Sequence, residues 1–372
     1  MNKRIIVSVT NDLATDQRVK KVCNSLKKLD YDILLVGRKL PESLELHRDY
    51  DCKRLNLIFN QGVLFYAEYN IRLFLLLLFS KVDVYHSNDL DTLLANFLAA
   101  KIRRKPLVYD SHEYFTGVPE IQNKPLVKGL WLAIECRIFP KLKYIFTVNP
   151  SIAQLYKTQY GKTLRIMRNM PNKTNLNKTR SKEDLGIPLD KDIIITQGAG
   201  INIDRGIEEA VEAMQYLEDV CFLIIGDGDV IPQLKQRVAE LGLQKSVLFK
   251  GKMPYLEMMQ YTQLAQLGLT LDKDTNINYR FSLPNKLFDY IHAGIPILAT
   301  KVVEVQKIIE TYNVGLFIEN HQPKHIADQI RLALGNVELQ NTWSENMERA
   351  TKELNWEHEE IALKEVYTEI EG

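Results

Sequence analysis

Two stretches in the second half of the chain contain residue types that bind phosphates. The first is Gln-Gly-Ala-Gly-Ile-Asn-Ile-Asp-Arg-Gly at 197–206, which follows an apolar run. Gly198 and Gly200 allow a backbone to approach a phosphate, a following helix N-terminus favours an anion, and Arg205 adds a forked donor. A short glycine-rich loop is a weak motif by itself, since such loops also serve as ordinary turns.

The second stretch, residues 283–296, is more informative. Pro284 suits the first turn of a helix, so Asn285 and Lys286 lie where free backbone amides meet an anion. Asp289 falls one turn later on the same face, where a carboxylate can hold two ribose hydroxyls. Phosphate donors beside a diol-binding acid predict a nucleotide-diphosphate site.

In the first half, His112 follows an apolar run at 107–110 and has Asp110 and Glu113 close to it in sequence. A histidine in this setting could orient a substrate hydroxyl or exchange a proton with it. The alternative is a structural histidine with satisfied hydrogen bonds. Asp89 follows another apolar run and is a further candidate for sugar or acceptor binding.

The loop after the first apolar run offers Asn11 and Asp12 as binding candidates, but it lacks GxGxxG, the dinucleotide fingerprint. Helix capping by Asp12 or Thr15 explains these residues equally well. Three DxD matches occur in the chain, which shows how common the pattern is, and no metal site is assigned.

Short apolar runs alternate with amphipathic helical patterns along the chain, which is typical of βαβ units with a parallel sheet. The polar stretch 169–190 interrupts this alternation and is interpreted as a linker. The expected strands are 4–10, 32–37, 82–86, 107–110, 144–148, 192–196, 221–226, 247–249, 267–271, 296–299 and 314–318. The chain therefore predicts two doubly wound α/β domains.

The composition fits a globular protein of two domains: 372 residues, 45% hydrophobic and 26% charged. Disorder and a disulfide scaffold are excluded, and the four scattered cysteines indicate a reduced, cytoplasmic chain. No run reaches the roughly 18 apolar residues that span a bilayer, and the N-terminus has no signal-peptide pattern.

Charge is unevenly distributed along the chain. Residues 1–182 hold 31 Lys and Arg against 16 Asp and Glu, whereas residues 183–372 hold 17 against 31. Solvated helix faces are the simpler explanation of the basic clusters. The alternative is a peripheral surface for anionic lipid, in which the basic residues alternate with aromatic ones. Those aromatic residues are Phe65, Tyr66, Phe74, Trp131 and Phe139. No nucleic-acid-binding motif is present, so no nucleic-acid partner is expected.

Taken together, these motifs resemble glycosyltransferase family 4, the retaining GT-B enzymes. The resemblance covers nearly the whole chain and is most specific at 283–296, Leu-Pro-Asn-Lys-Leu-Phe-Asp-Tyr-Ile-His-Ala-Gly-Ile-Pro. Leu-Val-Tyr-Asp-Ser-His at 107–112 is similar to the family segment that ends in a functional histidine. Further matches are 83–89, 146–151, 168–172, 204–207, 225–228, 247–251 and 355–357.

The resemblance implies two Rossmann-like domains facing a central cleft, with domain bounds of 1–172 plus 357–372 and 173–356. It implies a retaining, metal-independent transferase without a cofactor other than its nucleotide-diphosphate sugar donor. His112 would be the catalytic residue, Asp289 would bind the ribose, and the residues around Arg205 and Lys286 would bind the diphosphate. The expected acceptor is a lipid-linked saccharide of cell-surface polysaccharide synthesis, reached from the cytoplasm at the inner membrane face.

The chain departs from the family pattern at three places, of which the first is the loop after the first apolar run, where Asn11-Asp12 replaces the Gly-Gly often seen there. The family's paired glutamates correspond to Phe281 and Asp289, so the glutamate that contacts the donor sugar is missing. A second basic residue near Gly200 is also missing, and Arg280, Lys286 or Asn285 could replace it. These departures leave two alternatives open: a sugar-nucleotide epimerase or phosphorylase on the same scaffold, or a nucleotide-sugar-binding subunit that lacks catalysis.

Overall fold

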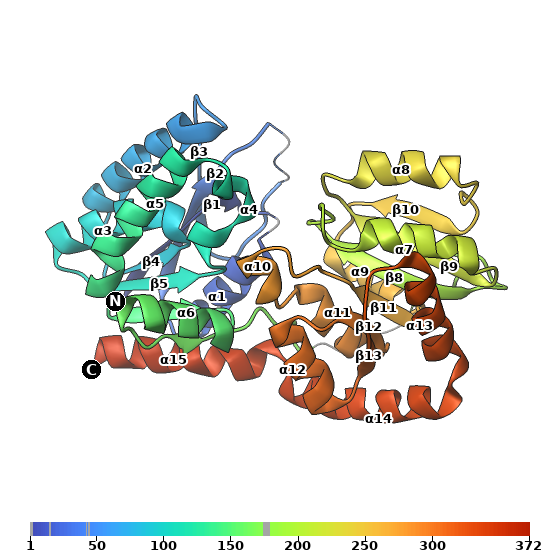
Figure 1. Ribbon diagram of the computed structural model, residues 1–372. Coiled ribbons are helices and arrows are strands. Elements are labelled where there is room, and N and C mark those ends of the chain that lie inside the picture. The colour runs from blue at the N-terminus through green and yellow to red at the C-terminus, as the bar shows by residue number, and fades with distance from the viewer. Residues whose placement is uncertain (1–2, 15, 42, 44, 174–178) are drawn as a thin grey trace. The chain divides into compact units, whose positions relative to one another are not determined.

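The computed structural model describes residues 3–14, 16–41, 43, 45–173 and 179–372, except for the side chain of Glu120. The chain divides into two compact units (Figure 1). Unit 1 comprises Met1–Asn169 and Trp356–Gly372, and unit 2 comprises Met170–Asn355. The sequence placed the boundaries three residues and one residue later, the second of them one residue inside the helix Trp356–Glu371.

Unit 1 is built on a seven-stranded, wholly parallel sheet of order β3-β2-β1-β4-β5-β6-β7. All five expected strands are present. The sequence missed β3, whose alternating charged residues hide it, and β7, which is two residues long. The strands are β1 Arg4–Asp12, β2 Asp32–Arg38, β3 Asp51–Leu55, β4 Val84–Asn88, β5 Leu107–Ser111, β6 Tyr144–Thr147 and β7 Arg165–Ile166.

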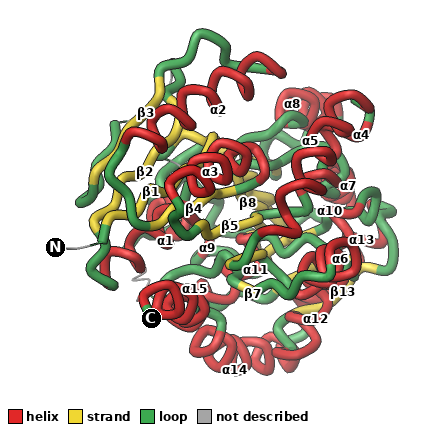
Figure 2. The backbone as a smooth tube through the Cα atoms, turned by 90° about the vertical axis from the view of Figure 1, so that its left-hand side faces the viewer, coloured by secondary structure: helices red, strands yellow, loops and turns green. Residues whose placement is uncertain are grey.

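Helices cover both faces of this sheet, as Figure 2 shows. Side chains alternate along each strand, so Ile5 and Val7 of β1 pack beneath α1 and α15, whereas Ile6 packs beneath α2 and α3. The helices are α1 Gln17–Lys28, α2 Gly62–Phe79, α3 Leu90–Arg103, α4 Pro119–Gln122, α5 Pro125–Ile138, α6 Pro150–Tyr160 and α15 Trp356–Glu371.

Unit 2 is a six-stranded parallel sheet of order β10-β9-β8-β11-β12-β13. Its strands are β8 Asp192–Gly198, β9 Val220–Gly226, β10 Val247–Gly251, β11 Leu267–Thr270, β12 Ile297–Thr300 and β13 Gly315–Ile318. Its helices are α7 Ile207–Ala213, α8 Ile231–Glu240, α9 Tyr255–Thr262, α10 Ile277–Arg280, α11 Asn285–Ala293, α12 Val303–Tyr312, α13 Pro323–Gly335 and α14 Val337–Glu353. Two core clusters lie on its two faces.

The last helix, α15, belongs to the first unit although it follows the second in sequence. Buried Trp356 donates from its indole Nε1 to Ser25 Oγ of α1 at 2.9 Å. Arg168 donates to Glu359 at 2.7 Å, and Tyr367 hydrogen-bonds His86 Nδ1 at 2.8 Å. The helix therefore fills one face of the first sheet with apolar and polar contacts together.

Helix α2 corrects one expectation from the sequence. By length and composition, its 18 residues could cross a membrane, although the sequence analysis found no such segment. Glu68 and Arg72 interrupt the apolar residues of this helix, so no uninterrupted apolar run in the sequence reaches its length. Only four residues of α2 are buried, namely Phe65, Tyr69, Leu73 and Leu77.

Candidate functional site

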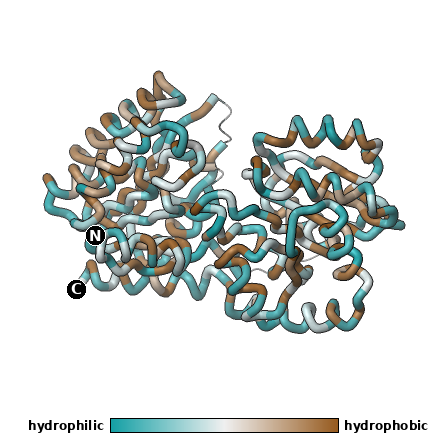
Figure 3. Tube along the Cα trace, in the orientation of Figure 1, coloured by the Kyte–Doolittle hydropathy of each residue, from teal (hydrophilic) through white to brown (hydrophobic). Residues whose placement is uncertain are grey.

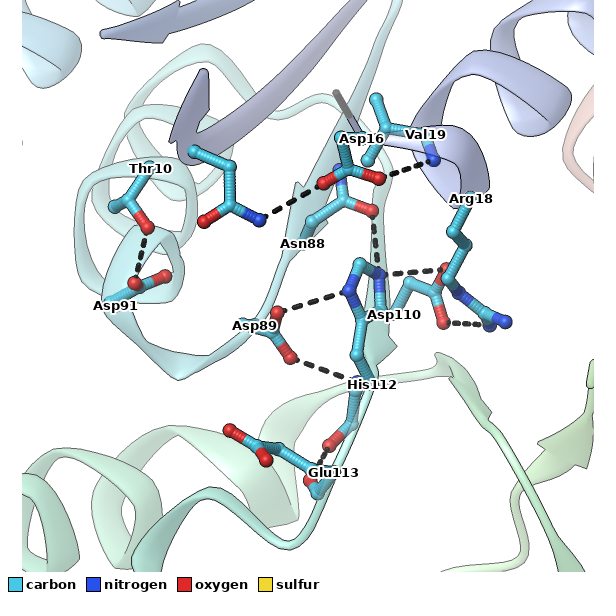
Figure 4. A network of polar contacts seen from close by, with 12 residues as sticks. Thr10, Asp16, Arg18, Val19, Asn88, Asp89, Asp91, Asp110, His112 and Glu113 are labelled. Carbon is cyan, nitrogen blue, oxygen red and sulfur yellow. Dashed lines mark hydrogen bonds and ion pairs between the residues drawn. The ribbon is translucent and has the colours of Figure 1, made fainter. Parts of the chain in front are cut away.

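The polar residues singled out in unit 1 gather at the carboxyl ends of β1, β4 and β5 (Figure 4). His112 follows β5 and lies between two carboxylates. Its Nδ1 is 3.1 Å from Asp89 Oδ2, and its Nε2 is 3.5 Å from Asp110 Oδ2 and 3.2 Å from Asn88 Oδ1. The backbone N–H of His112 also donates to Asp89 Oδ1 at 2.8 Å. The ring is therefore fixed on both edges.

Asp110 is itself held by Arg18 of α1, in a buried bidentate pair. Arg18 Nε and Nη2 donate to the two carboxylate oxygens at 3.0 and 2.7 Å, and Nη1 donates to the carbonyl of Met167 at 2.7 Å. Both side chains are almost wholly removed from solvent. Such a pair is specific in geometry, and it orients the carboxylate that faces His112.

These surroundings decide the charge of His112. Burial alone would lower the pKa of the imidazole, but the charges of Asp89 and Asp110 outweigh burial and raise it to about 10. At neutral pH both ring nitrogens then carry protons and act as donors. Of the two roles expected from the sequence, the geometry favours orienting a substrate over accepting a proton from it.

Asp91 lies nearby, at the start of α3, and accepts a hydrogen bond from Thr10 Oγ1 at 2.5 Å. Burial, followed by the charge of Asp89, raises the pKa of Asp91 to about 7. Asp91 was not predicted as a site residue, because Asp89-Leu-Asp91 is one of three DxD matches in the chain and that pattern is common.

The loop after β1 differs from expectation in its capping. Asp16 caps α1, accepting from the Val19 N–H at 3.0 Å, whereas the sequence offered capping by Asp12 or Thr15 as an equal alternative to ligand binding. Asp12 instead accepts from Arg54 at 3.1 Å, and Asn11 donates to Asp16 at 3.0 Å. Thr15 lies outside the described residues. Asn11 therefore helps to position the cap.

Glu113, the second carboxylate expected beside His112, has an exposed side chain, and Asp89 takes that place instead. Neighbours in sequence alternate in direction at the end of a strand, whereas Asp89 comes from the adjacent strand β4. The sequence identified His112 but missed Arg18 and Asn88, since long-range pairs leave no local pattern.

In unit 2, two cations face one buried carboxylate. Arg205 Nη1 donates to Asp272 Oδ2 at 2.7 Å, and its guanidinium lies 4.1 Å from the centre of the Tyr279 ring. Lys286 Nζ lies 3.4 Å from Thr196 Oγ1, and burial lowers the pKa of Lys286. Among the described residues no carboxylate oxygen lies within 4.0 Å of Lys286 Nζ. Positive charge therefore exceeds negative charge in this cluster.

The glycine-rich loop leaves open space above this cluster. A Cβ placed on Gly198 or Gly200 would meet nothing within 4 Å. Gly226 differs, because its Cβ would lie 1.8 Å from the carbonyl oxygen of Gly198. The turn after β9 thus supports the loop after β8, and the loop itself is free to receive a ligand.

Helix α11 begins as expected: Pro284 is its N-cap, Asn285 is exposed at its first position, and Gly294 ends it with a φ of +72°. Asp289 is 6% exposed, and its carboxylate accepts from Gln197 Nε2 at 3.0 Å and from the Tyr255 hydroxyl at 2.9 Å. The expected ribose ligand is thus already engaged, with Tyr255 beside it on α9.

The residues offered as substitutes for the missing family groups fall in different places. Arg280 is exposed and pairs with Asp274 at 2.9 Å, so it stands apart from the Asp272 cluster. Phe281 ends α10. Lys286, in contrast, lies in the same cluster as Arg205 and can supply the missing positive charge.

Comparison with protein families agrees with this arrangement. The family model described as "Glycosyl transferases group 1" matches residues 177–350, and that described as "Glycosyltransferase Family 4" matches residues 16–171. The chain belongs to glycosyltransferase family 4, of GT-B type. The two models divide this family 4 chain close to the boundary between its two units.

Two curated relatives of this family 4 chain match over part of their length. An uncharacterized glycosyltransferase of Methanocaldococcus jannaschii is 23% identical over 167 residues, 45% of each chain. An alpha-D-kanosaminyltransferase of Streptomyces kanamyceticus is 24% identical over 46% of this chain and 44% of the other. Each match therefore spans less than half of the relative.

Solved structures resemble the family 4 chain over its whole length. Sucrose-phosphate synthase from Thermosynechococcus elongatus gives a TM-score of 0.77 at 16% identity, with 99% of each chain covered. HepE of Anabaena, solved in complex with UDP-glucose, gives 0.75 at 15% identity, with 98% of this chain and 99% of that chain covered. These likenesses confirm the expected fold class of two Rossmann-like parallel-sheet domains.

Proposed function

We propose that the protein transfers a sugar from a nucleotide-diphosphate sugar to a hydroxyl of a lipid-linked saccharide, with retention of anomeric configuration and without a metal ion. The donor binds to unit 2 and the acceptor to unit 1. This reaction belongs to cell-surface polysaccharide synthesis, in the cytoplasm at the inner membrane face.

The observation that supports the donor site is the excess positive charge around Asp272. Arg205 pairs with that one buried carboxylate, Lys286 lies near it without contacting it, and the N-terminus of α11 adds backbone N–H groups. Lys286 is half-buried and has no carboxylate oxygen within 4.0 Å among the described residues, and a diphosphate would provide the missing negative charge. Open space above Gly198 and Gly200 leaves room for it.

The same cations explain how the reaction would proceed without a metal. Cleavage of the bond between sugar and diphosphate places negative charge on the leaving phosphate. Fixed donors such as Arg205 and Lys286 stabilise that charge as it develops. Both ring N–H groups of His112 already face Asp89, Asp110 and Asn88, so His112 would orient a hydroxyl of the transferred sugar by sharing one of these N–H groups with it rather than by removing a proton.

To bind a ribose, Asp289 must accept hydrogen bonds from the ribose hydroxyls in addition to those it already accepts. Two neutral donors, Gln197 and Tyr255, already occupy part of its acceptor capacity, although a carboxylate can accept further hydrogen bonds. We propose that the ribose hydroxyls meet Asp289 together with Tyr255, whose hydroxyl the carboxylate holds in place.

The proposal is tested by calorimetric titration with UDP-glucose, and with GDP- and ADP-sugars, in buffer containing EDTA. Lys286→Ala should weaken binding of the accepted donor about 10- to 100-fold, the usual value of a charge-assisted hydrogen bond. Lys301→Ala, which removes an exposed lysine paired with Glu319 in the same unit, should bind as tightly as the wild type.

Equal affinity of the Lys286→Ala and wild-type proteins would contradict the donor site. Product analysis tests the reaction itself: NMR of the linkage formed on a lipid-linked acceptor should show the anomeric configuration of the donor. Conversion of UDP-GlcNAc without an acceptor would indicate an epimerase instead, and donor binding without turnover would indicate a binding subunit.

A further inference from the structure

The outward side of α2 is apolar along its whole length. Every fourth residue from Val63 through Ala67, Ile71 and Leu75 to Phe79 is exposed, and we call these five residues the outer ridge. The four large side chains are 54%, 61%, 48% and 80% exposed in chain order. Figure 3 shows the hydrophobic colour along this helix.

The opposite side of α2 is apolar as well. Phe65, Tyr69, Leu73 and Leu77 are offset from the outer ridge by two residues, about 200° around the helix, and they are buried against the sheet. A surface helix of a globular protein ordinarily carries polar residues on its outer side. The five residues of the outer ridge carry no polar side chain, so the outer ridge calls for an apolar partner.

The surroundings of the outer ridge are basic. Arg72 lies on α2 itself, and exposed Lys101 and Arg104 lie at the end of the adjacent helix α3, next to exposed Ile102. Among the described acidic residues of α2, α3 and α5, Asp91 and Glu135 are buried. The third, Glu68, is turned toward Arg72 at 2.7 Å and toward backbone N–H groups at Ile58 and Phe59.

We propose that the outer ridge of α2 is the surface by which the protein enters the interface of a bilayer with anionic headgroups, with the helix axis parallel to the membrane. The four buried residues of α2, Phe65, Tyr69, Leu73 and Leu77, remain in the core of unit 1, so the helix does not span the bilayer. Apolar side chains reach the acyl boundary while Arg72, Lys101 and Arg104 meet the headgroups.

The positive charge around the outer ridge favours an anionic lipid surface over a second copy of the chain as its partner. A symmetric contact through this surface would bring its lysine and arginine residues close to their own copies. The inference rests on the proposed function for the reason to approach a membrane, since a lipid-linked acceptor is held there. It differs from the surface expected from the sequence, because Phe65, Trp131 and Phe139 are buried.

The test is co-sedimentation of the full chain with vesicles of phosphatidylcholine and phosphatidylglycerol. The triple variant Ile71→Ser, Leu75→Ser and Phe79→Ser should bind at least tenfold more weakly than the wild type. The matched control replaces three exposed apolar residues elsewhere, Leu189, Val337 and Ile361, with serine, and it should bind like the wild type.

Three results would overturn the inference. They are a wild type that does not bind these vesicles, a triple variant that binds equally well, and a wild-type dimer in sedimentation that the triple substitution converts to a monomer. If the triple variant does not fold by circular dichroism, Phe79→Trp replaces it. Its fluorescence should then be quenched by brominated lipid, and absence of quenching would overturn the inference.

UDP-glucose titration separates this inference from the proposed donor site. The triple variant should bind the donor as the wild type does, because α2 belongs to unit 1 and the donor residues belong to unit 2. Loss of vesicle binding with intact donor binding supports the α2 surface. Failure of the donor site would appear in the Lys286→Ala titration instead.

Discussion

His112 shows how neighbouring charges decide the chemistry of one residue. Its imidazole meets Asp89 on one edge and Asp110 with Asn88 on the other, and Arg18 fixes Asp110 from behind. The ring is therefore a positioned cation with two N–H donors. A base at this position would need a free lone pair, which an imidazolium lacks.

This charge state predicts a pH dependence of stability. The folded-state pKa of about 10 lies above the ordinary value near 6.5, so the contribution of His112 is complete below about pH 6.5 and is lost by about pH 10. Within that window, one proton changes the free energy of unfolding by up to about 1.4 kcal/mol per pH unit. Urea unfolding from pH 7 to 10 should show this slope.

His112→Gln should remove that component of the slope, whereas His47→Gln, which removes an exposed histidine of the same unit, should keep it. Identical slopes for the wild type and His112→Gln would show that the histidine is neutral in the folded protein.

At this scale the sequence predicted residues near strand ends but not their partners. It identified His112, Arg205 and Lys286, because their places after strands or at a helix start are local patterns. It did not predict that Arg18 would fix Asp110, since 92 residues separate the two. It also did not predict that Tyr255 and Gln197 would engage Asp289.

Among the elements, the turns after β8 and β9 support each other through backbone contact. Gly226 has a φ of +124°, and a side chain there would collide with the carbonyl of Gly198. The loop that carries Gly198 and Gly200 is consequently held from one side and left open on the other.

Gly226→Ala and Gly200→Ala should therefore differ in their effects on stability and on donor binding. Gly226→Ala combines a strained φ with a backbone collision, so it should lower the free energy of unfolding by more than about 2 kcal/mol in urea titrations. Gly200→Ala adds a methyl group into open space, so it should leave stability near that of the wild type and weaken donor binding. A stable Gly226→Ala protein would contradict this role of the turn.

The strands that the sequence predicted were those with continuous apolar runs, because both faces of a parallel sheet are covered. It missed β3 at the sheet edge, whose Lys53 and Arg54 broke the pattern, and it missed α2, whose apolar sequence is interrupted by Glu68 and Arg72. In both cases charged residues concealed an element that tertiary packing supports.

For the whole molecule, the division into units changes the meaning of the charge split. Unit 1 holds 28 Lys and Arg against 22 Asp and Glu, and unit 2 holds 20 against 25. The acidic helix α15 belongs to unit 1 and offsets part of its positive charge. The difference in net charge between the two units is therefore far smaller than that between the two halves of the sequence. The basic character relevant to lipid is local to α2 and α3.

Donor binding should stabilise the unit that carries the site. At a UDP-glucose concentration 100 times its Kd, the free energy of unfolding of unit 2 should rise by about 2.7 kcal/mol. Hydrogen exchange should then slow in the core strands β8 and β9. Lys286→Ala at the same concentration, with its 10- to 100-fold weaker binding, should gain only about 0.4 to 1.4 kcal/mol. Protection confined to peptides of unit 1 would place the donor elsewhere.

The return of α15 also has a consequence for how the chain matures on the ribosome. Residues 170–355 form a complete sheet with its helices and can fold as soon as they emerge. The residues of unit 1 that precede them are completed later, because Ser25, His86 and Arg168 find these partners only on α15, which follows unit 2 in the chain. Unit 1 is thus completed after unit 2, and the face of its sheet that α15 covers stays open while unit 2 is translated.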